Sequence, residues 1–125
     1  MCPNKNMNVC TGSSQLIFSC SGAADTGEIS DRAARKLTHQ GKGRMFCLAG
    51  IGGRVDPILK QTASAENILV IDGCPLDCTR RTLEEAGFRE FHHIRVTDLG
   101  FEKGKTAVNE TTITTVAQNA EPFLT

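Results

Sequence analysis

The strongest structural signal in the chain lies in residues 67–88, which read NILVIDGCPLDCTRRTLEEAGF. Residues 67–73 are expected to form a strand, because the apolar run at residues 68–71 has no alternating polar residues, as in a strand that is covered on both faces. Residues 74–88 follow directly and have the pattern of a helix, with Pro75 near the start and Gly87 near the end. A buried strand that leads into a helix is typical of a parallel sheet with helices packed against it.

The rest of the chain repeats this alternation of strand and helix. We expect further strands at residues 15–20, 44–48 and 92–100, helices at residues 28–41, from residue 56 onward and at residues 106–120, and a glycine-rich turn at residues 49–53. Asp25 is expected to cap the helix at residues 28–41. The order predicts a single three-layer α/β domain of flavodoxin-like kind, with a four-stranded, mainly parallel sheet and helices on both faces.

Length and composition define the expected domain boundaries. The chain has 125 residues, enough for one domain with its own core and too few for two. Residues 1–14 are rich in Asn, Ser, Gly and Thr and are expected to form a flexible N-terminal tail. The α/β domain is therefore expected to span residues 15–125.

The charge pattern disfavours several classes of partner. Lysine plus arginine number 14, aspartate plus glutamate also number 14, and the charges are scattered along the chain. Such a surface does not attract nucleic acid or an anionic membrane, and Trp and Tyr are absent as platforms for base stacking. No apolar run approaches the length of a membrane span, and residues 1–14 contain no apolar signal-peptide segment. We therefore expect a cytoplasmic protein with no nucleic-acid or membrane partner; a protein partner is not identified.

The cysteines point to a metal or thiol site. Cytoplasmic thiols stay reduced, so six cysteines favour metal or thiol chemistry over a disulfide framework. Cys20 ends the first expected strand, Cys47 ends the second, and Cys74 and Cys78 follow the third. The carboxyl ends of parallel strands lie at one edge of the sheet, where α/β proteins build their sites. Four of the six cysteines are therefore expected to converge.

The pair Cys74 and Cys78 has a spacing that suits a metal. If Pro75 lies in the first helical turn, Cys74 is near the cap and Cys78 is one turn further, with β-carbons about 5–6 Å apart. The amino end of a helix also favours the thiolate form that binds metals. Four thiolates suit zinc or an iron–sulfur centre better than magnesium or calcium, and zinc is the simplest choice because it needs no redox poise. Binding of no metal remains the other alternative.

Each of these residues also has a purely structural interpretation. Cys47 is as well explained by burial in the core, and Cys2 and Cys10 are expected to have no function. Asp72 is expected to orient the turn after its strand, and Asp77 to face solvent in the first helical turn. The neighbours His92 and His93 point to opposite faces of a strand, so we expect each to be hydrogen-bonded or solvated rather than a ligand.

Two other functions compete with a zinc site. The first is a thiol–disulfide or redox-sensing protein that uses Cys74 and Cys78, with Cys20 or Cys47 as the resolving thiol. The second is an enzyme with a cysteine nucleophile, of phosphatase or arsenate-reductase type. Such enzymes use C-x₅-R, whereas Thr26 lies six positions after Cys20 and Arg54 lies seven after Cys47. No catalytic residue is identified, and four protein thiolates around a metal leave no open position for catalysis.

The same residues carry a family resemblance. The stretches FSCSGAADTGEISDRAARKL, GRMFCLAGIGGR and IDGCPLDCTRRTLEEAGF resemble the DGC-domain family, which is described as zinc-binding and is named for the Asp-Gly-Cys at residues 72–74. The similarity runs from about residue 16 to residue 105. The four cysteines of the family pattern are all present, as Cys20, Cys47, Cys74 and Cys78. The resemblance implies a zinc site of four cysteines and leaves its biological role unassigned.

Overall fold

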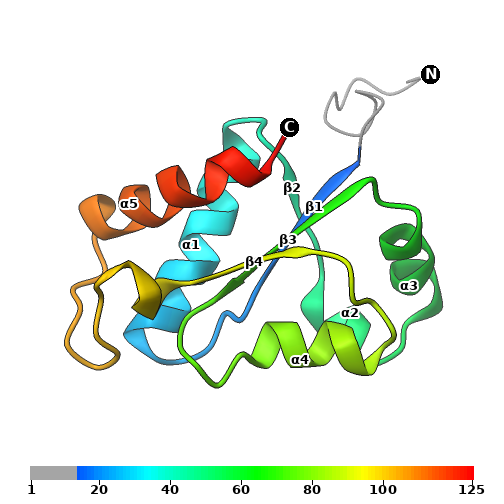
Figure 1. Ribbon diagram of the computed structural model, residues 1–125, viewed down its shortest axis with the longest axis horizontal. Helices are drawn as coiled ribbons and strands as arrows, with labels where there is room; N and C mark the ends of the chain where they lie inside the picture. The colour runs from blue at the N-terminus through cyan, green and yellow to red at the C-terminus, as the bar shows by residue number, and fades with distance from the viewer. Residues whose placement is uncertain (1–13) are drawn as a thin grey trace.

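A four-stranded, all-parallel sheet forms the centre of the molecule. The computed structural model describes residues 14–125. Its strands are β1 (Gln15–Ser19), β2 (Arg44–Met45), β3 (Asn67–Asp72) and β4 (His92–Arg95), in the order β2-β1-β3-β4 (Figure 1). The order reverses between β1 and β3, as in flavodoxin-like sheets, so the predicted fold class is confirmed. The predicted tail lies, apart from Ser14, outside the described residues.

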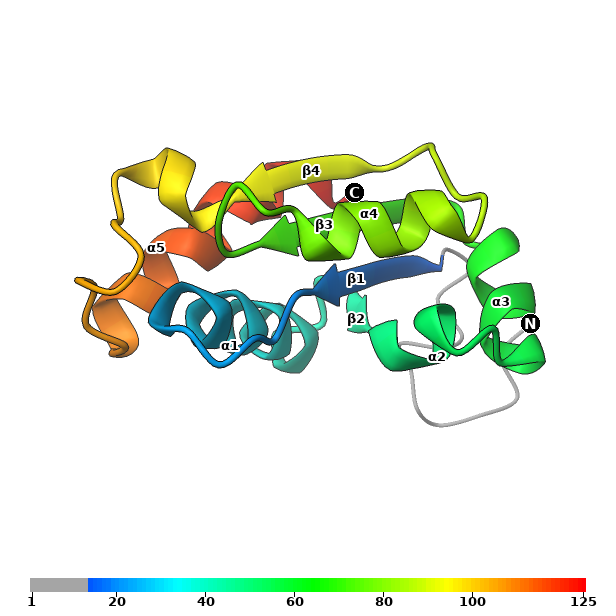
Figure 2. The ribbon, with the colours of Figure 1, turned by 90° about the horizontal axis from the view of Figure 1, so that it is seen from below.

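Helices cover both faces of this sheet. They are α1 (Asp25–His39), α2 (Leu48–Gly52), α3 (Asp56–Ala63), α4 (Cys78–Glu85) and α5 (Glu110–Ala120), with 3₁₀ turns η2 (Val96–Leu99) and η3 (Glu121–Phe123). Figure 1 shows α1 and α5 on one face and α2, α3 and α4 on the other, and Figure 2 shows the strand arrows pointing the same way. None of the helices in the described residues has the length and hydropathy that a transmembrane span requires.

The two central strands explain why both faces are covered. Successive side chains of a strand point to opposite faces, and β1 and β3 are buried at every position except the first. One core, against α1 and α5, contains Ile17, Leu69, Ile71, Ile29, Leu37 and Val116. The other, against α2, α3 and α4, contains Leu16, Phe18, Val70, Ile51 and Leu83. Each such buried side chain contributes about 1.5–3 kcal/mol through the hydrophobic effect.

Three predicted elements around β2 and β4 differ from the structure, two strands in extent and one turn in type. The strand expected at residues 44–48 ends at Met45, and the turn expected at residues 49–53 is the helix α2. A Cβ at Gly50 would lie 2.7 Å from Cγ1 of Ile58, so the lack of a side chain at Gly50 lets α2 pack closely against α3. The strand expected at residues 92–100 ends at Arg95, where the chain turns into η2.

The start of α1 is held by the loop that precedes α5. Asp25 is the first residue of α1 and not its cap, which is Ala24. The Asp25 carboxylate instead accepts hydrogen bonds from the backbone N–H of Gly104 and of Thr106, both at 2.9 Å. These bonds, that of Gly104 foremost, lower the pKa of Asp25. The last helix begins at Glu110, later than the expected residue 106, because Asn109 caps it through Thr112.

Candidate metal centre

All four predicted ligands lie at the carboxyl edge of the sheet. Cys20 follows β1 directly, and its backbone N–H continues the pairing by donating to the carbonyl of Ile71 on β3. Cys47 follows β2 by two residues, Cys74 follows β3 by two residues, and Cys78 is the first residue of α4. These positions come from three strands that run in the same direction, so the sequence placed the cysteines at one edge correctly.

The four thiols differ in exposure and in their neighbours. All four are free; Cys47 and Cys78 are exposed, and Cys20 and Cys74 are half-buried. Cys20 Sγ lies 3.2 Å from Ser30 Oγ, on the second turn of α1. Cys47 is the N-cap of α2, and its sulfur accepts a hydrogen bond from the N–H of Gly50 at 3.3 Å. The exposure of Cys47 rules out the alternative that it is a core residue.

Cys74 has a cation beside it. The Nζ of Lys103, from the loop after η2, lies 3.4 Å from Cys74 Sγ. The ammonium group donates a hydrogen bond to the sulfur from an element that follows β4 in the chain. This contact could not be predicted from the sequence, because 29 positions separate the two residues.

A shallow hollow joins several of these elements. Cys20 and Cys47 line one hollow of about 570 Å³ at the carboxyl edge, and Thr82 of α4 lines it as well. Thr82 lies one turn after Cys78 and donates a hydrogen bond to the Cys78 carbonyl at 2.7 Å. The hollow therefore brings two of the cysteines next to the helix that begins with a third.

The segment between Cys74 and Cys78 is a turn and not the start of a helix. The N–H of Asp77 donates to the carbonyl of Cys74 at 3.1 Å, with Pro75 at the second position of the turn. Helix α4 begins only at Cys78. The prediction that Cys74 caps the helix and shares a helical face with Cys78 is therefore wrong. The two cysteines instead lie on either side of a closed turn.

Asp77 is buried, which corrects the prediction that it faces solvent. Its side chain is 2% exposed and accepts hydrogen bonds from Arg95 Nε at 2.6 Å and Nη2 at 2.7 Å. Arg80 adds further bonds, through Nε at 3.2 Å and Nη2 at 3.0 Å. The Arg95 hydrogen bond is the main reason that the pKa of Asp77 falls to about 2, against the opposing effect of burial.

Asp72 binds the start of α4 from the strand, rather than the turn that it was predicted to orient. One carboxylate oxygen accepts from the N–H of Thr79 at 2.8 Å, and the other accepts from the N–H of Arg80 at 3.1 Å. These are N–H groups of the first turn of α4, which lack partners within the helix. His93 Nε2 lies 2.9 Å from Asp72, so His93 is hydrogen-bonded as predicted, and His92 is exposed and lies against Phe123.

Gly73 is required by a close approach between β3 and α1. A Cβ at this position would lie 2.8 Å from the backbone carbon and oxygen of Thr26, which no real side chain tolerates. The Asp-Gly-Cys sequence thus has a physical reason at each of its first two positions. Asp72 binds the start of α4, and Gly73 lets the strand end pass close to the start of α1.

One compact group of metal-ligand side chains exists within residues 14–125, and it contains no cysteine. The ligand atoms of Asp72, Asp77 and His93 lie within 4.8 Å of one another. Arg95 and Arg80 already neutralise Asp77, and Asp72 is bound to the start of α4, so these side chains act as a scaffold. In the described part of the chain the four cysteine sulfurs do not form such a group.

The sequence analysis missed the Asp77–Arg95 pair. The two residues come from different elements and are 18 positions apart. The register of the parallel strands brings them together, because Arg95 lies opposite Asp72 at the ends of β4 and β3. The sequence alone does not contain this register, so it offered no signal for the pair.

Comparisons with known proteins cover most of the chain. The model of the DGC domain matches residues 16–120, which include all four cysteines of the carboxyl edge. The "Anaerobic and virulence modulator AnvM" of Pseudomonas aeruginosa is 30% identical over 88 residues, which cover 70% of this chain and 67% of that protein. No solved structure matches the chain. The chain belongs to the DGC-domain family.

Proposed function

We propose that the protein binds one zinc ion through Cys20, Cys47, Cys74 and Cys78. The observation that carries the proposal is the placement of four free thiols, from three strand ends and one helix start, at a single edge of the sheet. Sulfur ligands suit zinc, and no hard oxygen ligand is needed to complete a tetrahedral shell.

The local contacts support metal binding by these residues. Cys47 and Cys78 are exposed, so their side chains are free to rotate toward a metal without breaking a packed core. Lys103 lies beside Cys74, and a positive charge at this position would offset part of the negative charge that four thiolates carry around a zinc ion. Binding would bring the sulfurs together to about 3.8 Å, the separation that four Zn–S bonds of about 2.3 Å impose.

The role that best suits such a site is structural or regulatory. Four protein thiolates would fill the coordination shell and leave no position for a substrate, which argues against Lewis-acid catalysis. The relative from Pseudomonas aeruginosa is named an anaerobic and virulence modulator. We extend the modulatory role to this chain, in a reducing cytoplasmic setting, because thiolates and their metal complexes respond to oxidants.

A redox function of the same cysteines is the second candidate. Cys74 and Cys78 lie on either side of one turn, the kind of close placement that thiol–disulfide exchange requires. A cysteine-nucleophile enzyme is less well supported. Arg35 lines the hollow with Cys20, but its Nε is bound to Asp31 at 2.7 Å, and Arg54 donates to the carbonyls of Ile51 and Glu85.

Metal analysis of cysteine variants tests the proposal. The untagged protein is purified anaerobically, and zinc is measured by mass spectrometry together with the number of reactive thiols. We expect about one zinc per chain and four thiols that react only after a chelator is added. Cys74→Ser and Cys78→Ser should lose the metal, whereas Cys10→Ser should retain it as the matched control. Full zinc in both ligand variants would refute the site, and metal-free protein with thiols that oxidise reversibly in pairs would favour the redox function.

A further inference from the structure

The turn between Cys74 and Cys78 contains a residue with an unusual backbone conformation. Asp77 has φ 54° and ψ 46°, in the left-handed region that residues other than Gly rarely adopt. Leu76, next to it, is 62% exposed, so the tip of the turn is not packed against the core. An unpacked turn with a strained residue needs polar contacts to keep one shape.

Polar contacts reach the turn from β4 and from α4. Arg95, the last residue of β4, binds both carboxylate oxygens of Asp77, and Arg80 of α4 binds one of them. Arg81 donates through Nε to the carbonyl of Leu76 at 3.1 Å. The Asp77 side chain is buried while Arg95 is about one-third exposed, so the ion pair lies partly shielded from water. Shielding from water strengthens an ion pair.

A second anchor fixes the residues on either side of the turn. Asp72, two residues before Cys74, binds the N–H of Thr79, one residue after Cys78. One buried carboxylate, Asp72, thus precedes Cys74, and a second, Asp77, lies between the two cysteines, each with its partners in place. Fewer contacts orient the other two cysteines. Cys20 Sγ contacts one hydroxyl group, and Cys47 Sγ accepts a hydrogen bond from one backbone N–H.

We infer that Asp77 and Arg95 are positioning residues for the metal site. Their ion pair holds the turn in the shape that presents Cys74 and Cys78 together, before any metal arrives. A preorganised pair of ligands lowers the ordering cost of binding and slows metal release. This inference rests on the proposed zinc site, and it adds which residues outside the four cysteines set the affinity of that site.

Three substitutions separate the effect of the ion pair from general damage. Asp77→Asn keeps the shape of the side chain but removes its charge. Asn also tolerates the left-handed backbone region, so the substitution adds no backbone strain. Arg95→Lys keeps the charge but cannot bind both oxygens at once. Asp98→Asn is the matched control, because Asp98 also binds Arg95, at 3.3 Å, but is 60% exposed and lies outside the turn.

The measurement is zinc affinity and zinc release from the loaded protein, by competition with a chromophoric chelator. We expect Asp77→Asn and Arg95→Lys to weaken binding by roughly 10- to 100-fold and to speed release, as the loss of partners that orient ligands does elsewhere. Asp98→Asn should match the wild type. The spectrum of the cobalt-substituted protein should still report thiolate ligands, so the change is one of affinity and not of ligand identity.

The possible outcomes distinguish the two proposals. A wild-type protein that binds no zinc would refute the proposed function itself. Zinc bound by the wild type and equally tightly by Asp77→Asn and Arg95→Lys would refute only the positioning role. Should Asp77→Asn not fold, Arg95→Lys decides alone. A purely structural role would lower the melting temperature of the variants while leaving their zinc affinity unchanged, and that result also counts against positioning.

Discussion

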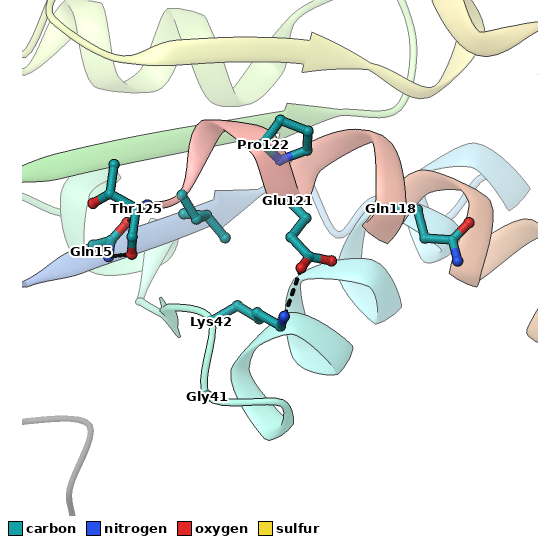
Figure 3. A pocket seen from close by; sticks show the side chains of 8 residues that line it. Gln15, Gly41, Lys42, Gln118, Glu121, Pro122 and Thr125 are labelled. Atoms are coloured by element: carbon teal, nitrogen blue, oxygen red, sulfur yellow. Dashed lines mark hydrogen bonds and ion pairs between the residues drawn. The ribbon is translucent and has the colours of Figure 1, made fainter.

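The two edges of the sheet use the same kind of interaction in opposite settings. At the carboxyl edge, Arg95 binds Asp77, whose side chain is 2% exposed. At the amino edge, Lys42 binds Glu121 at 2.6 Å across a hollow of about 620 Å³ (Figure 3), and both side chains are 42% exposed. The amino-edge hollow is as large as the hollow beside the cysteines but offers amide, hydroxyl and mixed charged groups, with no thiol among the residues that line it. Residue chemistry and burial, rather than volume, distinguish the candidate site.

Burial explains why the two ion pairs should contribute differently to stability. An ion pair in water contributes about 0–1 kcal/mol because solvent screens it and both side chains lose freedom. Removal of one partner from a buried pair costs about 3–5 kcal/mol, because the other charge is left without compensation. We therefore expect substitutions at the carboxyl edge to affect stability far more than equivalent substitutions at the amino edge.

Removal of the metal should have the largest effect on stability. If zinc holds the carboxyl edge together, chelation should cost on the order of 10 kcal/mol of folding free energy at neutral pH. Urea unfolding of the reduced protein, with and without chelator, measures this loss. An unchanged unfolding midpoint would show that the metal does not stabilise the fold. The two edges would then differ only in the strength of their ion pairs.

Loss of the buried ion pair should come second. Arg95→Ala removes the bidentate partner of buried Asp77 and leaves Arg80 and, at 3.6 Å, His93 beside it, so we expect a loss of about 3 kcal/mol, at the lower end of the range for broken buried pairs. Urea unfolding at pH 7 gives the value, and Asp98→Asn should stay within about 0.5 kcal/mol of the wild type. An equal loss in the two variants would mean that burial of Asp77 is unimportant.

A methyl group at Gly73 should have an intermediate effect. Gly73→Ala places a Cβ 2.8 Å from the Thr26 backbone, and overpacking of this kind costs about 1–3 kcal/mol. Gly22→Ala is the matched control in the adjacent loop, since a Cβ there meets nothing within 4 Å. Thermal unfolding of the two variants compares them directly. Equal melting temperatures would contradict the close approach of β3 and α1.

The amino edge should be the least sensitive region. Glu121→Gln removes the charged partner of Lys42, and we expect the free energy of unfolding to change by about 0.5 kcal/mol or less. High salt screens this ion pair in the wild type, so the difference between the wild type and the variant should disappear at high ionic strength. Urea unfolding at low and high ionic strength checks this. A loss as large as that of Arg95→Ala would remove the contrast between the two edges.

The sequence predicted the features that depend on local pattern. The apolar run of β3 and its direct continuation into Cys74 were enough to predict a parallel sheet with cysteines at one edge. Element ends were less predictable. The helix α2 contains two glycines and was expected to be a turn, because its stability comes from packing against α3 and α4, which a local pattern does not contain.

The scaffold around the cysteines depends on contacts that a sequence does not display. Asp77 looked like a solvent-facing helix residue, because its burial depends on Arg95 from another strand. Lys103 reaches Cys74 from a loop whose path is fixed by Asp25. The register of β3 and β4 and the left-handed turn at Asp77 decide these contacts, and both require the folded chain.

The measurement that tests the central claim most directly is zinc-edge X-ray absorption spectroscopy of the anaerobically purified protein. The account predicts four sulfur neighbours at about 2.3 Å and no nitrogen or oxygen at bonding distance. Zinc bound by nitrogen and oxygen instead of sulfur would place the metal away from the four cysteines. That result, or the absence of bound zinc, would contradict the assignment of the carboxyl edge as the metal centre.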